Sequence, residues 1–90
     1  MGTTLVKIKI MPTSPDVDLE EIKESAKKVV ESNKGKNISF EEEPIAFGLK
    51  AVIVGFGIDE NDELEPIENS LREMENVSSA EVSDMRRAFG

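Results

Sequence analysis

The sequence lacks the residue types that carry most reactive chemistry in proteins: it has no cysteine, histidine, tryptophan or tyrosine. Without cysteine there is no disulfide, no thiolate nucleophile and no cysteine-ligated metal site. Histidine performs most acid–base catalysis at neutral pH, and that option is also absent. Nothing in this composition indicates catalysis, so we do not expect an enzyme.

Long apolar runs and an excess of positive charge are missing as well. No segment is apolar enough to cross a membrane, and the N-terminus does not have the pattern of a signal peptide, so we expect a cytoplasmic protein with no membrane partner. Nineteen acidic residues stand against eleven basic ones, for a net charge of -8. A protein that binds phosphate backbones needs the opposite sign, so no direct nucleic-acid partner is expected. The acidity suits a partner with a basic surface, but on charge alone a well-solvated acidic domain is the favoured explanation.

The hydrophobic pattern predicts six elements in ninety residues, which suits one domain spanning residues 1–90. Alternating or continuous apolar runs predict strands over residues 5–10, 37–43, 49–56 and 79–85, and helical periodicity predicts helices over residues 19–32 and 64–75. Asp18 is a good N-cap for the first helix. We expect a polar turn over residues 58–62 and a basic tail from Met85 to Gly90.

This order of elements predicts a ferredoxin-like α+β sandwich. Two right-handed βαβ halves give a four-stranded antiparallel sheet with both helices on one face. The first and third strands then lie in the middle, with Val52, Val54 and Phe56 under the helices and Ala80 and Val82 also pointing inward. The open face lacks the aromatic pair with which sheets of this fold bind RNA.

Two acidic runs do not form reactive sites. Glu41, Glu42 and Glu43 lie on one strand, where neighbouring side chains face opposite sides, so they are not a preset acid pair. The acidic residues between positions 59 and 63 do not follow the spacing of a calcium loop. We expect neither a metal site nor a cofactor.

The stretch from Glu43 to Val54 organises the rest of the chain. Pro44 and Gly48 bracket a predicted surface turn that carries Phe47, just before the most apolar strand. An aromatic side chain at such a tip either folds back into the core or is offered to a partner. General burial tendencies favour the core.

Three segments, 11–18, 43–51 and 82–87, make the chain resemble the archaeal elongation factor 1-beta family of guanine nucleotide exchange factors. They read MPTSPDVD, EPIAFGLKA and VSDMRR, and they match the family's first loop, its hallmark motif and its last strand and tail. The resemblance covers essentially the whole chain. More distantly, the chain is similar to the exchange domain of the eukaryotic factor, whose hallmark reads Gly-Phe/Tyr-Gly-Ile-Lys-Lys.

The resemblance implies a cytoplasmic translation factor that promotes GDP release and GTP loading on elongation factor 1-alpha, a GTPase. It implies that Phe47, with Gly48 and Lys50 beside it, docks on a second domain of the GTPase, which reverses the expectation of a buried Phe47. It also implies that the basic tail, formed by Met85, Arg86 and Arg87, reaches the magnesium and phosphate site, with Arg87 aligned to the family's lysine.

The chain departs from the family pattern at both ends of this predicted site. Paired arginines replace the lysine, Ala88, Phe89 and Gly90 extend the chain, and Ala51 stands where the eukaryotic branch has a second lysine. Without the resemblance, a regulatory or small-molecule-binding module of the same fold, or a structural domain, would be favoured. A binding module needs a concave apolar pocket, whereas an exchange factor needs a projecting Phe47.

Overall fold

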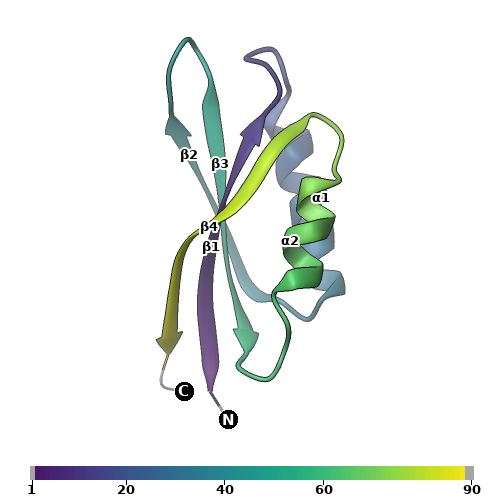
Figure 1. Cartoon of the computed structure of the whole chain (residues 1–90), viewed down its shortest axis with the longest axis vertical. Helices are drawn as coiled ribbons and strands as arrows, with labels where there is room; N and C mark the ends of the chain where they lie inside the picture. Colours follow the sequence, from purple (N-terminus) through teal and green to yellow (C-terminus); the bar gives the residue numbers. More distant parts are fainter. Residues whose placement is uncertain (1, 89–90) are drawn as a thin grey trace.

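The computed structural model describes residues 2–88 of the chain and confirms the predicted order of elements (Figure 1). The elements are β1 (Thr3–Pro12), α1 (Leu19–Ser32), β2 (Lys36–Pro44), β3 (Lys50–Asp59), α2 (Glu65–Arg72) and β4 (Val77–Ala88). The bounds of α1 are those predicted. Asp18 caps this helix by accepting a hydrogen bond from the Glu20 amide at 3.0 Å.

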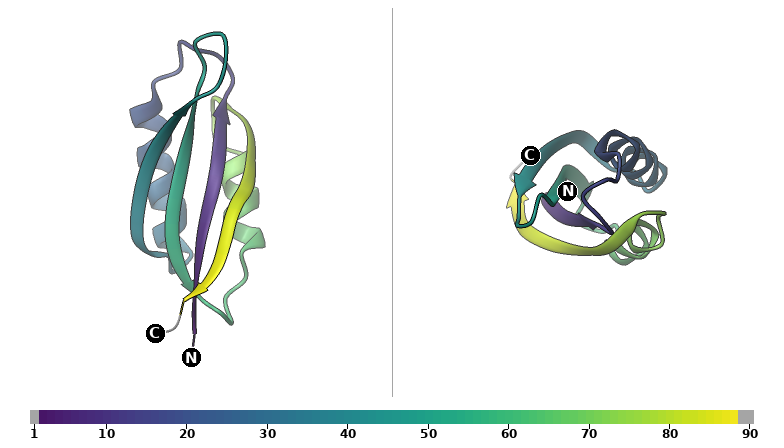
Figure 2. Two further views of the ribbon diagram at one scale, coloured as in Figure 1. Left: turned by 90° about the vertical axis from the view of Figure 1, so that its left-hand side faces the viewer. Right: turned by 90° about the horizontal axis from the view of Figure 1, so that it is seen from above.

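The four strands form one antiparallel sheet in the order β2-β3-β1-β4, so β1 and β3 occupy the middle as predicted. Both helices pack on one side of the sheet, called here the helix face (Figure 1). The opposite side, called here the open face, carries no helix and is turned toward the viewer in the left panel of Figure 2. The fold is therefore the ferredoxin-like α+β sandwich.

The core lies between the helix face and the two helices. It contains Val6, Ile8 and Ile10 of β1, Val52, Val54, Phe56 and Ile58 of β3, Ile22, Ala26 and Val30 of α1, Ile67 and Leu71 of α2, and Ala80 of β4. Every second residue of β1 and β3 belongs to this set because successive side chains of a strand point to opposite faces. No helix within residues 2–88 is both long and apolar enough to span a bilayer.

The predicted turn over residues 58–62 begins too early. Strand β3 continues to Asp59, with Gly57 opposite Leu5 and Ile58 opposite Thr4 of β1. Ile58 is 5% exposed and belongs to the core. Its apolar side chain extends the alternation of β3, and the glycine before it hid this continuation in the sequence. Helix α2 is shorter than predicted and ends at Arg72.

The predicted tail is also wrong, because β4 pairs with β1 as far as Ala88. Its register shifts between Val82, opposite Ile8, and Asp84, opposite Lys7, so Ser83 is the extra residue of a β-bulge. Val82 shares the face of Ile8 as predicted, but it remains 36% exposed at the edge of the sheet. The predicted extension at Phe89 and Gly90 lies outside the described residues.

Candidate functional site

Phe47 occupies the tip of the β2–β3 hairpin and is 96% exposed, which confirms the predicted exposure. The Leu49 amide donates a hydrogen bond to the Ala46 carbonyl at 2.9 Å, and φ is 55° at Phe47 and 80° at Gly48. A turn of this kind with positive φ at both central residues is a type I′ turn, which normally uses Asn, Asp or Gly at these places. A bulky side chain in the left-handed region costs about 1–2 kcal/mol.

Neither packing nor backbone preference therefore explains Phe47. A large aromatic side chain gains nothing from full exposure to water, and the backbone of Phe47 is held in a region that bulky residues avoid. Strain of this kind is concentrated at ligand- and partner-binding positions. Phe47 is thus a candidate docking group on structural grounds alone.

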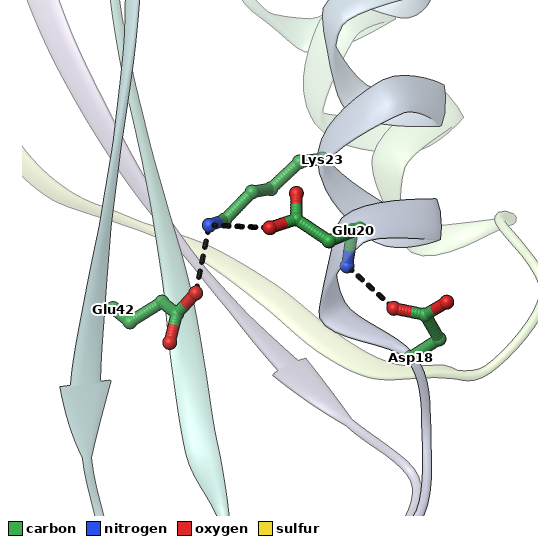
Figure 3. A network of polar contacts seen from close by, with 4 residues as sticks. All are labelled: Asp18, Glu20, Lys23 and Glu42. Atoms are coloured by element: carbon green, nitrogen blue, oxygen red, sulfur yellow. Dashed lines mark hydrogen bonds and ion pairs between the residues drawn. The ribbon is translucent and has the colours of Figure 1, made fainter.

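The base of this hairpin is fixed from the helix face. The Lys23 ammonium of α1 lies 2.7 Å from a Glu42 carboxylate oxygen of β2 and 3.8 Å from a Glu20 carboxylate oxygen. Figure 3 shows Lys23 between the two carboxylates. The hydrogen bond to Glu42 raises the pKa of Lys23, and the same hydrogen bond lowers the pKa of Glu42. The pair joins an edge strand to the helix layer close to the turn.

A second ion pair fixes the hairpin from the open face. Lys9 of β1 lies 3.4 Å from Glu43 of β2, so the pair crosses the intervening strand β3. Ala51 of β3, opposite Glu43, is fully buried although it lies on the open face. The two neighbouring glutamates thus brace opposite sides of the strand that leads to Phe47.

Gly48 and Lys50 lie beside a hollow of about 310 Å³ between the hairpin and the β1–α1 loop, with Pro12 and Pro15 on its other side. A Cβ on Gly48 would be 3.8 Å from the Pro15 Cβ, an ordinary contact, so the positive φ and not the available space requires glycine here. Lys50 is exposed at the first position of β3. Phe47, Gly48 and Lys50 therefore form one group at the hairpin end of the sheet.

The basic residues of β4 lie at the other end of the sheet, opposite the first residues of β1. In Figure 1 this is the end of the sheet at which β4 finishes. Opposed residues of an antiparallel pair share a face. Arg86 is opposite Leu5, on the open face, and its Nε lies 3.0 Å from Asp84. Met85 is opposite the buried Val6, which places it, and Arg87 two residues later, on the helix side of the strand. Both Arg86 and Arg87 are exposed.

The predicted site residues thus form two separate groups, a hairpin group of Phe47, Gly48 and Lys50 and a strand-end group of Met85, Arg86 and Arg87. The two arginines point to opposite faces of the sheet. The lysine partners of Glu42 and Glu43 were not predicted, although the alternation of charged residues along the strand is a signal that could have found them. The bulge at Ser83 leaves no signal in the sequence, because serine fits a regular strand as well.

Within residues 2–88 there is no group of three or more acidic, histidine or cysteine side chains that could hold a metal ion. An exposed aromatic side chain on a braced hairpin, on a two-layer α+β domain, is typical of a module that binds another macromolecule.

Comparison with known proteins identifies this module. Residues 5–88 match the EF-1 guanine nucleotide exchange domain. Elongation factor 1-beta of Methanococcus maripaludis is 44% identical over 86 residues, which cover 94% of this chain and 97% of the relative. Elongation factor 1-beta of Methanocaldococcus jannaschii is 43% identical over 89 residues, covering 98% of this chain and 100% of the relative. The chain belongs to the elongation factor 1 guanine nucleotide exchange domain family, a family of translation elongation factors.

Proposed function

We propose that residues 1–90 act as a single exchange domain in the cytoplasm, which promotes GDP release and GTP loading on elongation factor 1-alpha. The domain has no catalytic site of its own and acts without direct contact to nucleic acid or membrane. The membership of the family supports this proposal, and the structural observation that carries it is the 96% exposure of Phe47 on a braced turn. A small-molecule module of the same fold would leave that exposure unexplained.

Exchange requires differential binding. The factor must bind the nucleotide-free GTPase more tightly than the GDP-bound form, and linkage then makes the GTPase hold GDP more weakly by the same factor. Each tenfold weakening of GDP binding needs about 1.4 kcal/mol of differential affinity. The hairpin group supplies affinity for both states of the GTPase, whereas a group at the nucleotide site makes the affinity for the nucleotide-free state higher than that for the GDP-bound state.

The separation of the two groups supports two distinct contacts on the partner. Arg87 of β4 and Ile58 of β3 both pair with Thr4 of β1, so Arg87 and Ile58 lie at the same height along the sheet. About eleven residues of β3 and its turn separate Ile58 from Phe47. At about 3.3 Å per residue this is about 36 Å, and the long axis of the molecule measures 42 Å. A standard interface of about 800 Å² per partner is about 28 Å across. Phe47 with Gly48 and Lys50 would contact one domain of the GTPase, and the strand end another.

Arg87 is the residue that we propose acts at the magnesium and phosphate site of the GTPase, with Met85 beside it on the same face. Bound nucleotide is held partly by magnesium and by phosphate-cradling groups. A guanidinium that enters this site repels the metal and competes for the surrounding oxygens, and it stays charged at any working pH. Its interaction is available only as the metal leaves, so it favours the nucleotide-free state.

Release of labelled GDP from elongation factor 1-alpha tests this role. Arg87→Ala should lower the maximal release rate with little change in the factor concentration that gives half-maximal release, and the loss should shrink when free magnesium is removed. Arg86→Ala is the matched variant on the opposite face. If both single variants and the double variant release GDP as fast as the parent protein, the basic strand end has no role in exchange.

A further inference from the structure

The open face contains a hollow of about 270 Å³ that is separate from the hairpin group and is bordered by Arg86 but not by Arg87. Gly55 of β3 forms part of its floor, and its rim includes Leu5, Lys7, Ser39, Asp84 and Arg86. A Cβ on Gly55 would lie 2.8 Å from the Ser39 hydroxyl oxygen, so the missing side chain at Gly55 helps to keep this space open. The left panel of Figure 2 shows that no helix covers this face.

The strand register brings two basic side chains to the rim. Lys7 is opposite both Gly55 and Asp84, and Arg86 is opposite Leu5, one step along the same face. Such diagonal neighbours are about 7–8 Å apart, within reach of long side chains. The Ser83 hydroxyl donates a hydrogen bond to the Lys7 carbonyl at 3.3 Å and thereby ties the bulge to β1 beside the hollow. The bulge is what turns Asp84 and Arg86 toward this face.

The charge of the rim is opposite to that of the whole protein. Lys7 and Arg86 contribute two positive charges and Asp84, bound to Arg86 at 3.0 Å, contributes one negative charge, in a chain of net charge -8. Leu5 adds an apolar wall that is 45% exposed. A carboxylate can accept hydrogen bonds from both an ammonium and a guanidinium, and its methylene groups can pack on a leucine.

We propose that this hollow receives an acidic side chain of the GTPase, between Lys7 and Arg86; this inference rests on the proposed exchange function. The position of the hollow supports this occupant. Gly55 lies eight residues beyond Phe47, or about 26 Å along the strand, between the hairpin group and the strand end. A partner that contacts both ends must span the distance between them, and the open face, which carries Arg86 at the strand end, is the side of the sheet that the helices leave free.

Charge reversal at the rim tests the proposal. The variants are Lys7→Glu and Arg86→Glu, and the control is Lys27→Glu, an exposed residue of α1 that undergoes the same change of charge. Labelled-GDP release from elongation factor 1-alpha is measured against factor concentration at several salt concentrations. Lys7→Glu and Arg86→Glu should each raise the half-maximal concentration about tenfold at low salt and less at high salt, without changing the maximal rate. Lys27→Glu should change it less than about twofold.

The outcomes separate this inference from the function beneath it. If Lys7→Glu behaves like Lys27→Glu while Phe47→Ala still impairs release, the hollow is not part of the interface and the exchange function stands. If the parent protein itself does not accelerate release, both proposals fail. If inorganic phosphate shifts the Gly55 amide resonance of the free chain at low millimolar concentration and free glutamate does not, the hollow is a site for free phosphate, and the proposed occupant is wrong. Thermal unfolding of each variant shows that the fold is intact.

Discussion

Replacement of Phe47 by asparagine should separate stability from binding more sharply than replacement by alanine. Phe47 has a φ of 55° and is 96% exposed, so its side chain contributes almost nothing to the core while its backbone costs about 1–2 kcal/mol. Asparagine tolerates this conformation and is preferred in type I′ turns. Phe47→Asn should therefore raise the free energy of unfolding by up to about 1 kcal/mol, which raises Tm by about 4–8 °C in a domain of this size.

The same substitution should weaken binding to elongation factor 1-alpha. A docked phenylalanine buries about 150–250 Å², worth at most about 4–6 kcal/mol at 25 cal/mol per Å². Ordering and desolvation costs reduce this, and truncation of an aromatic anchor commonly costs about 2 kcal/mol or more, or about 30-fold in affinity. The concentration of factor that gives half-maximal GDP release should rise by at least this factor for Phe47→Asn and Phe47→Ala alike.

Phe47→Asn should therefore change stability and binding in opposite directions. Phe47→Asn should melt at or above the Tm of the parent protein, and Phe47→Ala should melt close to it. Phe56, which is only 3% exposed, provides the contrast: Phe56→Ala should lose about 3–5 kcal/mol of stability. If Phe47→Asn melts many degrees lower, Phe47 is a core residue in solution. If the concentration of Phe47→Asn that gives half-maximal GDP release equals that of the parent protein, Phe47 is not a docking group.

Other predictions concern the elements that support the site. The lowered pKa of Glu42 means that its pair with Lys23 stabilises the fold above the usual pKa of glutamate, and this effect is lost as the pH falls through the lower folded pKa. Glu42→Gln should therefore flatten the loss of stability in urea unfolding below about pH 4.5. Gly48→Ala should cost about 1–2 kcal/mol in the same assay because φ is 80° there, and a null effect would show that the turn changes type. Ile58→Ala should cost about 2–5 kcal/mol; a loss below 1 kcal/mol would contradict its place in the core.

The fold was predictable because its determinants are periodic. Val6, Ile8 and Ile10 alternate with polar residues, and α1 carries a cap at Asp18 together with a helical apolar stripe. These patterns place each segment on one face of a two-layer domain without reference to any other segment. The errors lie at the ends of elements. At Ile58, pairing with β1 extends strand β3 beyond the residues whose local pattern predicts a strand.

The candidate site was predictable only in part. Pro44 and Gly48 predict the turn that carries Phe47, and the exposure of the Phe47 side chain was expected from the resemblance to a known family. The ion pair between Lys23 and Glu42 joins residues nineteen positions apart, and the hollow at Gly55 depends on which strands lie side by side. The ion pair and the hollow depend on how elements pack against one another, and a local sequence pattern does not predict that packing.

The role of each arginine depends on a single inserted residue. With strict alternation from Ala80 and Val82, Arg87 would lie on the open face opposite Thr3, and Arg86 would lie on the helix side opposite Thr4. The bulge at Ser83 exchanges them, because Asp84 and not Ser83 stands opposite Lys7. Two adjacent cations that look equivalent in the sequence therefore serve different surfaces, one the hollow over Gly55 and the other the far side of the strand. Single substitutions at these two positions should consequently change different quantities. Substitution of Arg86 should change the factor concentration that gives half-maximal GDP release, and substitution of Arg87 should change the maximal rate of release. Equal effects of both substitutions on both quantities would contradict the register observed in β4.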